Sequence, residues 1–261
     1  MPTAEILTIG NELIEGLRTN TNATWLAKEL TDVGVRVAQI TSVSDVVEDI
    51  VAAIRGVLSR SPDVLIITGG LGPTIDDRTS EALARATRRK LVLNHAALEI
   101  VKLNYERLHA RGLVLRKELS SARRKMAIIP NGATVLPNPV GTAPGIQLRQ
   151  GKTLMICLPG VPAEMMAIFT RHVRGDLVKL SGRVQHRVLI YVRGIDESTL
   201  APLLERLAKK FRRLDVRSYP SGKGIKGRIR VMLVAPTAAE ARDAEKIFNR
   251  WLNKLRLSVL H

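Results

Sequence analysis

The segment "DVLIITGGLGPTIDD" (63–77) decides the fold of this chain. Its first half is an unbroken apolar run, which is typical of a parallel strand with helices on both faces of the sheet. Three glycines and a proline follow, and the segment ends on the adjacent acids Asp76 and Asp77. Two interpretations are open at this point. Either a strand ends and a helix is capped, or backbone amides hold a phosphate beside a metal-binding aspartate.

Strands and helices alternate along the chain up to this segment. The spacing of apolar residues predicts strands at 4–10 and 35–43 and helices at 20–34 and 45–59. The second helix opens on Asp45-x-x-Glu48, which resembles a capping box, and a third is expected from near Asp77 toward Arg89. This order predicts a parallel sheet with right-handed crossovers, and such sheets bind ligands at the carboxyl ends of their strands.

The remainder of the chain divides into two parts. In the first part, we expect basic helices from residue 95 to about 127. Short strands between Pro, Gly and Asn turns follow, and a helix is expected from about 162 to 173. The composition then changes, and a strand, helix, strand, strand, helix pattern follows. We therefore predict an α/β fold, with a three-layer α/β/α mostly parallel sheet over 1–175 and a second, smaller α+β domain over 185–261.

The net charge of +17 is distributed unevenly. Residues 1–82 carry 6 Lys and Arg against 12 Asp and Glu, whereas 83–175 carry 16 against 4 and 176–261 carry 19 against 8. A basic field attracts polyanions, either nucleic acid or small phosphates. Aromatic residues make up only 3% of the chain, which is too few for a convincing base-stacking platform. The Lys and Arg residues could equally form an ordinary solvent-exposed surface that binds no partner. The glycine turn lies in the acidic first third of the chain.

Several classes of protein and site are excluded. A single cysteine, Cys157, rules out an internal disulfide and fits a reducing cytoplasm. We expect no signal peptide and no membrane partner, because no apolar run approaches the roughly 20 residues of a membrane span. The five histidines form no cluster at metal-ligand spacing. "GKT" (151–153) fails the P-loop pattern because Ile146 stands where glycine is required, and "GIKG" (224–227) echoes a KH loop but leads into a strand.

The glycine turn is the main candidate for a binding site. Gly69, Gly70 and Gly72 can leave amides exposed and let a ligand approach the main chain closely. Asp76 and Asp77 would repel a bound phosphate unless a divalent cation lay between them, and Mg²⁺ is held in this way by one or two carboxylates together with phosphate oxygens. The pattern therefore predicts a site for a phosphate and a divalent metal ion.

Other segments are expected at the same edge of the sheet. Asp45 follows the second strand, although a helix N-cap is its simpler interpretation. The loops "PNPVGTAPG" (137–145) and "LPGVPAE" (158–164) are rich in Gly and Pro, and the second brings Glu164 into the first turn of a helix. Three such loops in one domain predict the rim of a ligand site.

Four segments together resemble one known family. "GNELIEGLRTNTNATWLAKEL", "TGGLGPTIDDRTSEALA", "NPVGTAPG" and "LPGVPAEM" occur in the order found in the N-terminal region of the competence/damage-inducible CinA proteins, which is related to the MoaB/MogA molybdopterin-binding domain. The resemblance covers about 4–175, and the stretch from "RGIDESTLAPLLERL" onward looks like the KH-type domain that follows in CinA proteins. Because this sequence stops at His261, we expect neither their C-terminal nicotinamide-mononucleotide deamidase domain nor its activity.

The resemblance implies a homo-oligomer that binds a nucleotide or a pterin phosphate at the strand ends. Asp77 matches an acidic residue that helps to bind Mg²⁺, and Asp45 matches an aspartate after the second strand. The sequence departs from the family at Asn11, where aspartate is usual, and at Ile75, where histidine is frequent, so any role of that histidine is absent. The expected ligand-binding residues are Gly10, Asn11, Gly69, Gly70, Gly72, Thr74, Gly141, Thr142, Gly145, Pro159, Gly160 and Glu164.

Three functional hypotheses follow. The first is a metal-dependent hydrolase of a nucleoside diphosphate compound such as ADP-ribose, an activity to which CinA relatives have been linked. Its catalytic residues would be Asp77, Asp76 and Glu12, with Glu12 as the candidate base and Asp45 and Asp77 as metal ligands. The second is a non-catalytic molybdopterin- or nucleotide-binding protein related to molybdenum cofactor biosynthesis. The third is an RNA-binding protein that uses the basic remainder of the chain.

Overall fold

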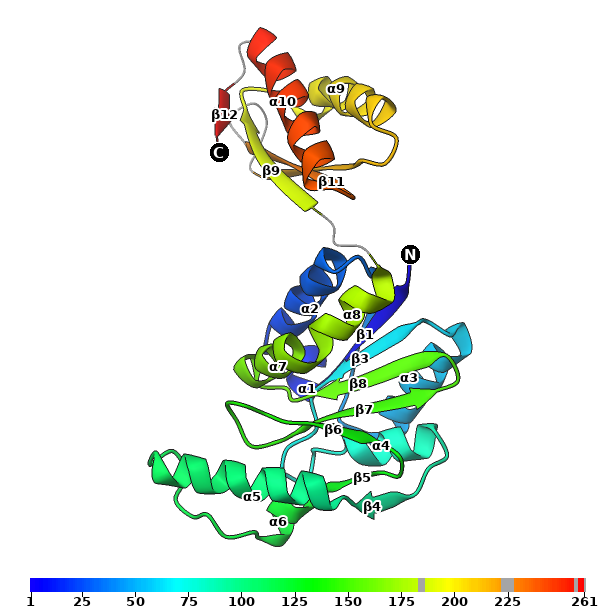
Figure 1. The fold of residues 1–261 in the computed structure, drawn as a ribbon, viewed down its shortest axis with the longest axis vertical. Coiled ribbons are helices and arrows are strands. Elements are labelled where there is room, and N and C mark those ends of the chain that lie inside the picture. Colours follow the sequence, from blue (N-terminus) through cyan, green and yellow to red (C-terminus); the bar gives the residue numbers. More distant parts are fainter. Residues whose placement is uncertain (183–185, 222–227, 256–257, 261) are drawn as a thin grey trace. The chain divides into compact units, whose positions relative to one another are not determined.

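The chain folds into two compact units (Figure 1). The computed structural model describes residues 1–182, 186–221, 228–255 and 258–260. The first unit contains 1–31 and 35–181, and the second contains 32–34 and 182–261. None of the described helices is long and apolar enough to cross a membrane.

A six-stranded sheet forms the centre of the first unit. Its strands are, in spatial order, β2 (Arg36–Val43), β1 (Thr3–Ile9), β3 (Val64–Thr68), β8 (Thr153–Leu158), β7 (Gly145–Gln150) and β6 (Thr134–Leu136). The first four are parallel, and the last two join them antiparallel. All five residues of β3 are buried, as expected for a strand with both faces covered. The predicted α/β fold with a mostly parallel sheet is confirmed.

Helices cover both faces of this sheet (Figure 1). The helices α3 (Val47–Arg60), α4 (Thr79–Ala86) and α5 (His95–Ala110) pack on one face, against the core that includes Leu65, Ile67 and Cys157. The helices α2 (Thr21–Asp32), α7 (Pro162–Ile168) and α8 (Arg174–Ser181) lie on the other, where Trp25 meets Phe169 edge to face. Burial without a nearby counter-charge raises the pKa of Cys157 to about 12, so this thiol is a structural group.

Two helices begin two residues later than expected, because another residue engages the aspartate at each expected start. The helix α3 begins at Val47 with no side-chain cap, because the Asp45 carboxylate accepts the N–H of Asn11 at 3.0 Å instead. The capping box is therefore not formed. The helix α4 begins at Thr79, since the Asp77 carboxylate is engaged by Thr74 inside the preceding turn.

Two other predicted helical segments differ in length from the helices in the structure. The basic stretch after residue 95 is interrupted, because α5 ends at Ala110 and only the short α6 (Ser121–Lys125) follows. The antiparallel pair β4 (Leu91–Leu93) and β5 (Ile128–Pro130) joins the two ends of this segment, residues 91–130, which we call the basic excursion. The helix that starts at Pro162 continues past its expected end, through the π-helical turn η1 (Phe169–Val173) into α8.

The second unit is a smaller antiparallel sheet with two helices on one face. The strand order is β10 (Asp215–Ser221), β11 (Arg228–Ala235), β9 (His186–Arg193) and β12 (Ser258–Leu260), and the helices are α9 (Glu197–Lys210) and α10 (Ala238–Lys254). Phe248 and Leu252 of α10 pack with Ile190 and Val231 of the strands in a core of its own. The segment 224–227, in which a KH-like loop was considered, lies outside the described residues, so the KH-type assignment stays a prediction.

An ion pair between a buried glutamate and a half-exposed arginine joins the sheet of the first unit to α3. The carboxylate of Glu5 in β1 is 5% exposed and accepts two hydrogen bonds from Arg60, from Nε at 2.9 Å and from Nη2 at 2.6 Å. We expect Arg60→Met to lower the free energy of unfolding by about 2 kcal/mol, because it leaves a buried carboxylate unpaired. The double variant Glu5→Met/Arg60→Met should recover most of this loss. Urea denaturation checks both values, and equal losses in the two variants would contradict the pairing argument.

Candidate functional site

A cleft lies where the carboxyl ends of β1, β3 and β8 meet. Its volume is about 470 Å³, within the range of small-molecule sites. Its walls come from the ends of the three strands and from the loop before β7. The lining residues are Ile9, Gly10, Glu12, Arg18, Asp45, Gly69, Gly70, Leu71, Gly72, Pro73, Asp76, Asp77, Thr142, Ala143, Pro159, Gly160, Val161, Pro162 and Glu164.

Four of the expected ligand-binding residues do not line this cleft. Asn11 turns its side chain to the backbone of Asp45, whose N–H it accepts at 3.2 Å. Thr74 wraps around the Asp77 carboxylate. Gly141 lies behind the Glu164 side chain, and Gly145 belongs to β7, where an added Cβ would lie 3.1 Å from the carbonyl oxygen of Cys157. These four residues support the walls of the cleft and do not face its interior.

The glycine turn after β3 is locked in place by two buried threonines. Thr79 donates its hydroxyl to the carbonyl of Gly69 at 2.7 Å, and Thr68 donates to the carbonyl of Pro159 at 2.9 Å. Gly69 and Gly70 have φ values of 109° and 65°, which favour glycine. The Gly69 N–H donates to the carbonyl of Leu158 at 3.1 Å, so it is not one of the phosphate donors expected from sequence.

The amides of Gly70 and Gly72 remain candidates for that role. No residue in the described part of the chain accepts a hydrogen bond from either N–H group. Both glycines line the cleft. Two backbone donors near the end of a parallel strand can hold an anion.

Three glycines around the cleft make room for carboxylates. Each carboxylate lies where the glycine's missing side chain would project, in the pairs Gly10 with Glu12, Gly72 with Asp77, and Gly141 with Glu164. An added Cβ would approach the nearest carboxyl atom to 2.5 Å at Gly10 and at Gly72, and would overlap the Glu164 carboxyl group at Gly141. Such approaches are far shorter than any real contact, so each glycine sets the position of an acid.

Negative charges converge on one side of the cleft. Burial raises the pKa of Asp45, the Asn11 N–H opposes this, and the charges of Glu12, Asp76 and Asp77 raise it further. The hydroxyl of Thr74 and the nearby Lys125 lower the pKa of Asp76. Asp45 and Asp77 therefore lie near enough to interact, although they come from different strand ends.

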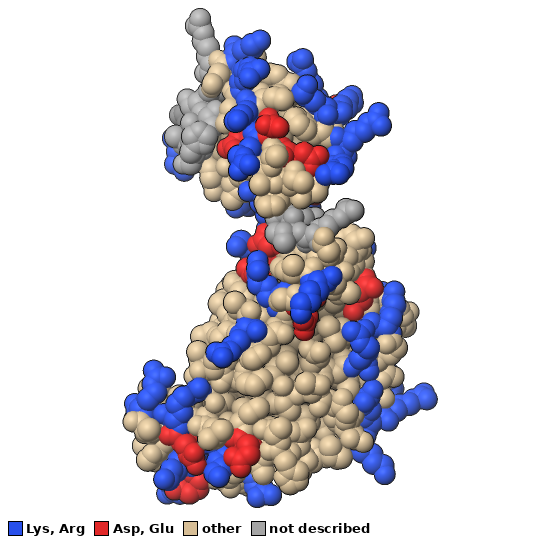
Figure 2. Space-filling model, viewed as in Figure 1, with Lys and Arg blue, Asp and Glu red and all other residues tan. Residues whose placement is uncertain are grey.

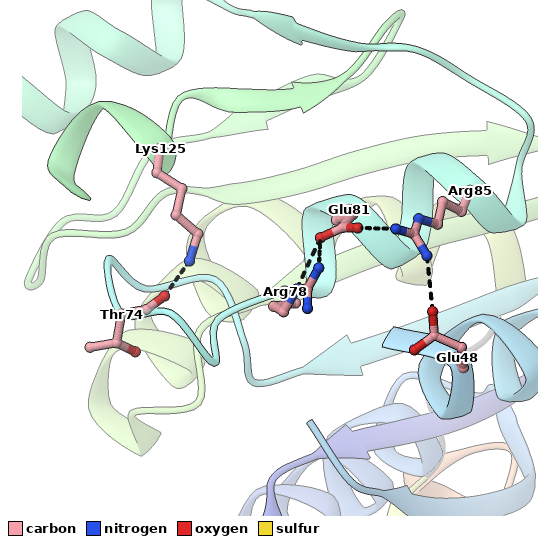
Figure 3. Close-up of polar contacts among 6 residues, drawn as sticks. All are labelled: Glu48, Thr74, Arg78, Glu81, Arg85 and Lys125. Carbon is pink, nitrogen blue, oxygen red and sulfur yellow. Dashed lines mark hydrogen bonds and ion pairs between the residues drawn. The ribbon is translucent and has the colours of Figure 1, made fainter. Parts of the chain in front are cut away.

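A lysine from the basic excursion reaches this acidic turn (Figure 3). Lys125 of α6 donates its ammonium to the carbonyl of Thr74, and Thr74 in turn donates its N–H and hydroxyl to Asp77 at 2.9 and 2.6 Å. Burial lowers the pKa of Lys125, while Asp77 and Asp76 oppose that change. The turn is thus fixed from inside by an aspartate and from outside by a lysine.

A chain of ion pairs orients the helix that follows the turn (Figure 3). Glu81 of α4 accepts from Arg78 at 2.6 Å and from Arg85 at 2.5 Å, and Arg85 also meets Glu48 of α3 at 3.1 Å. These groups are partly exposed, so each pair contributes little stability. They pair the N-cap residue Arg78 and the helix residue Arg85 with acids, and they connect α4 to α3.

The opposite wall depends on the buried Asn138. Its amide donates to Ala143 O at 2.8 Å and to Glu164 Oε2 at 2.5 Å, and its oxygen accepts the N–H of Gly141 at 2.8 Å. Burial raises the pKa of Glu164, whereas the Asn138 amide and the Thr142 N–H lower it. One asparagine therefore holds the loop and the acid together.

Comparisons with known proteins identify the first unit. Residues 5–179 match the model of a family described as "Probable molybdopterin binding domain". This chain belongs to that family. It is 43% identical over 249 residues to a protein of Pyrobaculum calidifontis, with 94% of this chain and 92% of that one covered. It is 44% identical over 234 residues to protein PF0476 of Pyrococcus furiosus, with 89% and 90% covered.

A solved structure also matches the family domain. It is described as the protein CinA with unknown function from Thermoplasma acidophilum. The identity is 36%, the TM-score is 0.60, and the match covers 67% of this chain and 98% of that one. The likeness to a CinA protein expected from the four sequence segments is therefore supported for this domain, while the deamidase prediction is not tested by it.

The family domain also contains site residues that sequence reasoning missed. Arg18 lines the cleft together with Glu12, and both border a smaller hollow of about 80 Å³. Asn22 donates to Thr68 at 3.2 Å and to the carbonyl of Gly160 at 2.8 Å, tying α2 to two strand ends. Polar residues at 20–22 looked like ordinary helix caps, and Asn20 does cap α2. Nothing in the spacing of these residues indicates that Asn22 contacts residues far along the chain.

No preformed metal cage is present in the described part of the chain. Among these residues, no group of three or more His, Cys, Asp or Glu side chains is arranged to hold a metal ion. Asp77 and Asp45 are nevertheless oxygen donors that face the same cleft. The donor set fits a cation such as Mg²⁺, which keeps waters and completes its shell with phosphate oxygens.

The glycine at 141 provides a direct test of this geometry. Gly141→Ala should lower the free energy of unfolding by about 1–2 kcal/mol, because Glu164 must leave its place and its bond to Asn138. Gly175→Ala is the matched control, since an added Cβ there meets nothing within 4 Å. Chemical denaturation measures both. In a Glu164→Ala background the cost of Gly141→Ala should shrink, and an unchanged cost would contradict the explanation.

Proposed function

We propose that the cleft binds a nucleotide or a pterin phosphate together with a divalent cation. The family supports a ligand of the molybdopterin type, and the volume of about 470 Å³ suits one. The observation that carries the proposal is the convergence of Asp45, Asp76 and Asp77 beside the amides of Gly70 and Gly72. Amide donors favour an anion and carboxylates favour a cation, so a metal–phosphate pair satisfies both.

The carboxylates explain why a cation is needed in this proposal. Burial, and to a smaller extent the charges of nearby acids, raise the pKa of Asp45 in the folded protein, so its ionisation destabilises the fold as the pH rises between its ordinary and its raised value. A divalent ion near Asp45 and Asp77 would remove this repulsion and neutralise phosphate charge. Gly70 and Gly72 would then donate to phosphate oxygens, and Arg18 would add a positive charge at the rim.

Asp45→Asn tests the cation. Asparagine can still accept the Asn11 N–H but carries no charge, so we expect a higher melting temperature than wild type at pH 7 without metal. Mg²⁺ should raise the melting temperature of the wild type and have little effect on the variant. With AMP as probe, calorimetry should show Mg²⁺-dependent binding that weakens about tenfold or more in the variant.

Acid conditions and a second substitution extend this test. Lowering the pH toward the raised pKa of Asp45 should weaken Mg²⁺ binding in the wild type, because protons compete with the cation. Asp243→Asn is the matched control, because Asp243 is exposed on α10 and does not line the cleft. AMP binding that is indifferent to Mg²⁺, or lost equally in both variants, would refute the proposed role of Asp45.

Hydrolysis of a diphosphate such as ADP-ribose is the second candidate function. The observation in its favour is Glu12, whose carboxylate lines the cleft while no described residue donates a hydrogen bond to it. A carboxylate in that position can orient a water or accept its proton. A bound divalent ion would stabilise developing charge and activate water. By contrast, Asp77 is engaged with Thr74, which favours a positioning role over a catalytic one.

Glu12→Gln separates the two functions. If the protein hydrolyses ADP-ribose, the variant should lose about 100-fold or more in kcat with little change in Mg²⁺-dependent binding. Product formation is followed by chromatography over a range of enzyme concentrations. Tight binding without product in the wild type would leave the binding function standing and exclude hydrolysis of this substrate. Self-association and a cytoplasmic location stay predictions, and the oligomeric state is measurable by light scattering.

A further inference from the structure

The sheet of the second unit has one face that α9 and α10 do not cover. Ile190, Val192 and Val231 point toward the helices and are fully buried. Since side chains alternate along a strand, their neighbours in sequence point to the other side. We name that side the tyrosine face, after Tyr191, Arg193, Arg217, Tyr219, Arg228 and Arg230. Tyr219 is 38% exposed, and Arg217, Arg228 and Arg230 are exposed as well.

Strand register places aromatic and basic groups in rows across this face. Tyr191 of β9 is opposite Arg230 of β11, and Arg230 is opposite Tyr219 of β10. The next row pairs Arg193 with Arg228. The Arg230 guanidinium carbon lies 5.1 Å from the centroid of the Tyr219 ring, within cation–π range. Two of the three tyrosines in the whole chain therefore share one row with an arginine between them.

Basic residues outnumber acidic ones in this unit. Residues 182–261 contain 18 Lys and Arg against 7 Asp and Glu, and on the side of this unit that Figure 2 draws, Lys and Arg surround a smaller group of Asp and Glu. On the tyrosine face the nearby acid is Asp215, which is occupied by Arg217 at 2.9 Å. Such a surface attracts a polyanion.

We propose that the tyrosine face binds single-stranded nucleic acid. Unpaired bases stack on flat rings, while arginines contact the backbone phosphates, and a sheet presents both in one plane. A duplex keeps its bases inside and would use only the arginines. An acidic protein would likewise leave the row of tyrosines without a role. The low aromatic content of the chain does not argue against base stacking, because two of its three tyrosines lie on this face, where bases can stack on them.

Fluorescence anisotropy with the full-length protein tests the proposal. The probes are labelled single strands of about 12 nucleotides, as RNA and as DNA, and binding of either supports it. Tyr219→Ala should weaken binding by about tenfold without changing the salt dependence, because it removes stacking and no charge. Tyr219→Phe should bind like the wild type, because the ring remains. Arg230→Ala should reduce the slope of log K against log salt by about 0.7, because one phosphate contact is lost.

Two controls separate a specific face from general basicity. Arg242→Ala removes the same charge from an exposed position on α10, on the other side of the unit, and should leave binding unchanged. An abasic strand, which needs no variant, should bind to the wild type at least as weakly as a normal strand binds to Tyr219→Ala, because it loses stacking on both tyrosines. Equal loss in Arg242→Ala and Arg230→Ala, or equal affinity for duplex and single strand, would overturn the proposal.

Other outcomes are equally decisive. Effective competition by polyglutamate, with Tyr219→Ala binding as tightly as wild type, would point to an acidic protein and overturn it. The face and the cleft belong to different units, so the proposal does not depend on the proposed ligand of the cleft. Tyr219→Ala should therefore keep Mg²⁺-dependent AMP binding, and its melting temperature should match that of Tyr219→Phe.

Discussion

Three of the acidic side chains at the cleft occupy space that nearby glycines leave free. Glu12, Asp77 and Glu164 each fill the volume that a side chain at a nearby glycine would occupy. This exclusion fixes the carboxylates against the main chain and directs them to one region. Two other glycines of the same region, Gly69 and Gly70, have positive φ values and give the turn after β3 its conformation.

Other residues of the first unit donate hydrogen bonds to these acids and to the turn that carries them. Lys125 arrives from the basic excursion, which lies between β3 and β6 in the sequence, and it holds the acidic turn at Thr74. Asn11 and Asn138 donate to carboxylates without adding charge. What these contacts leave uncompensated is the mutual repulsion around Asp45, and the proposed metal–phosphate ligand would relieve it.

Acidic and basic residues are distributed differently in the two units, which the net charge of the whole chain does not show. The cleft lies among the acids of the first 82 residues, while the second unit is strongly basic. A small phosphate ligand with its cation suits the first environment, and a long polyanion suits the second. The third hypothesis drawn from the sequence, nucleic-acid binding, thereby acquires a location distinct from the small-molecule cleft, on a sheet face defined by Tyr191, Arg230 and Tyr219.

The sequence by itself determined the order of strands and helices, the parallel sheet and the segments around the cleft, because apolar periodicity and glycine turns are local properties. It could not show that Asp45 bonds Asn11 and not its own helix, that Gly69 donates to Leu158, or that Gly145 lies inside a strand. Those outcomes depend on partners far along the chain. The row of tyrosines likewise needs the register of three strands, which only tertiary packing decides.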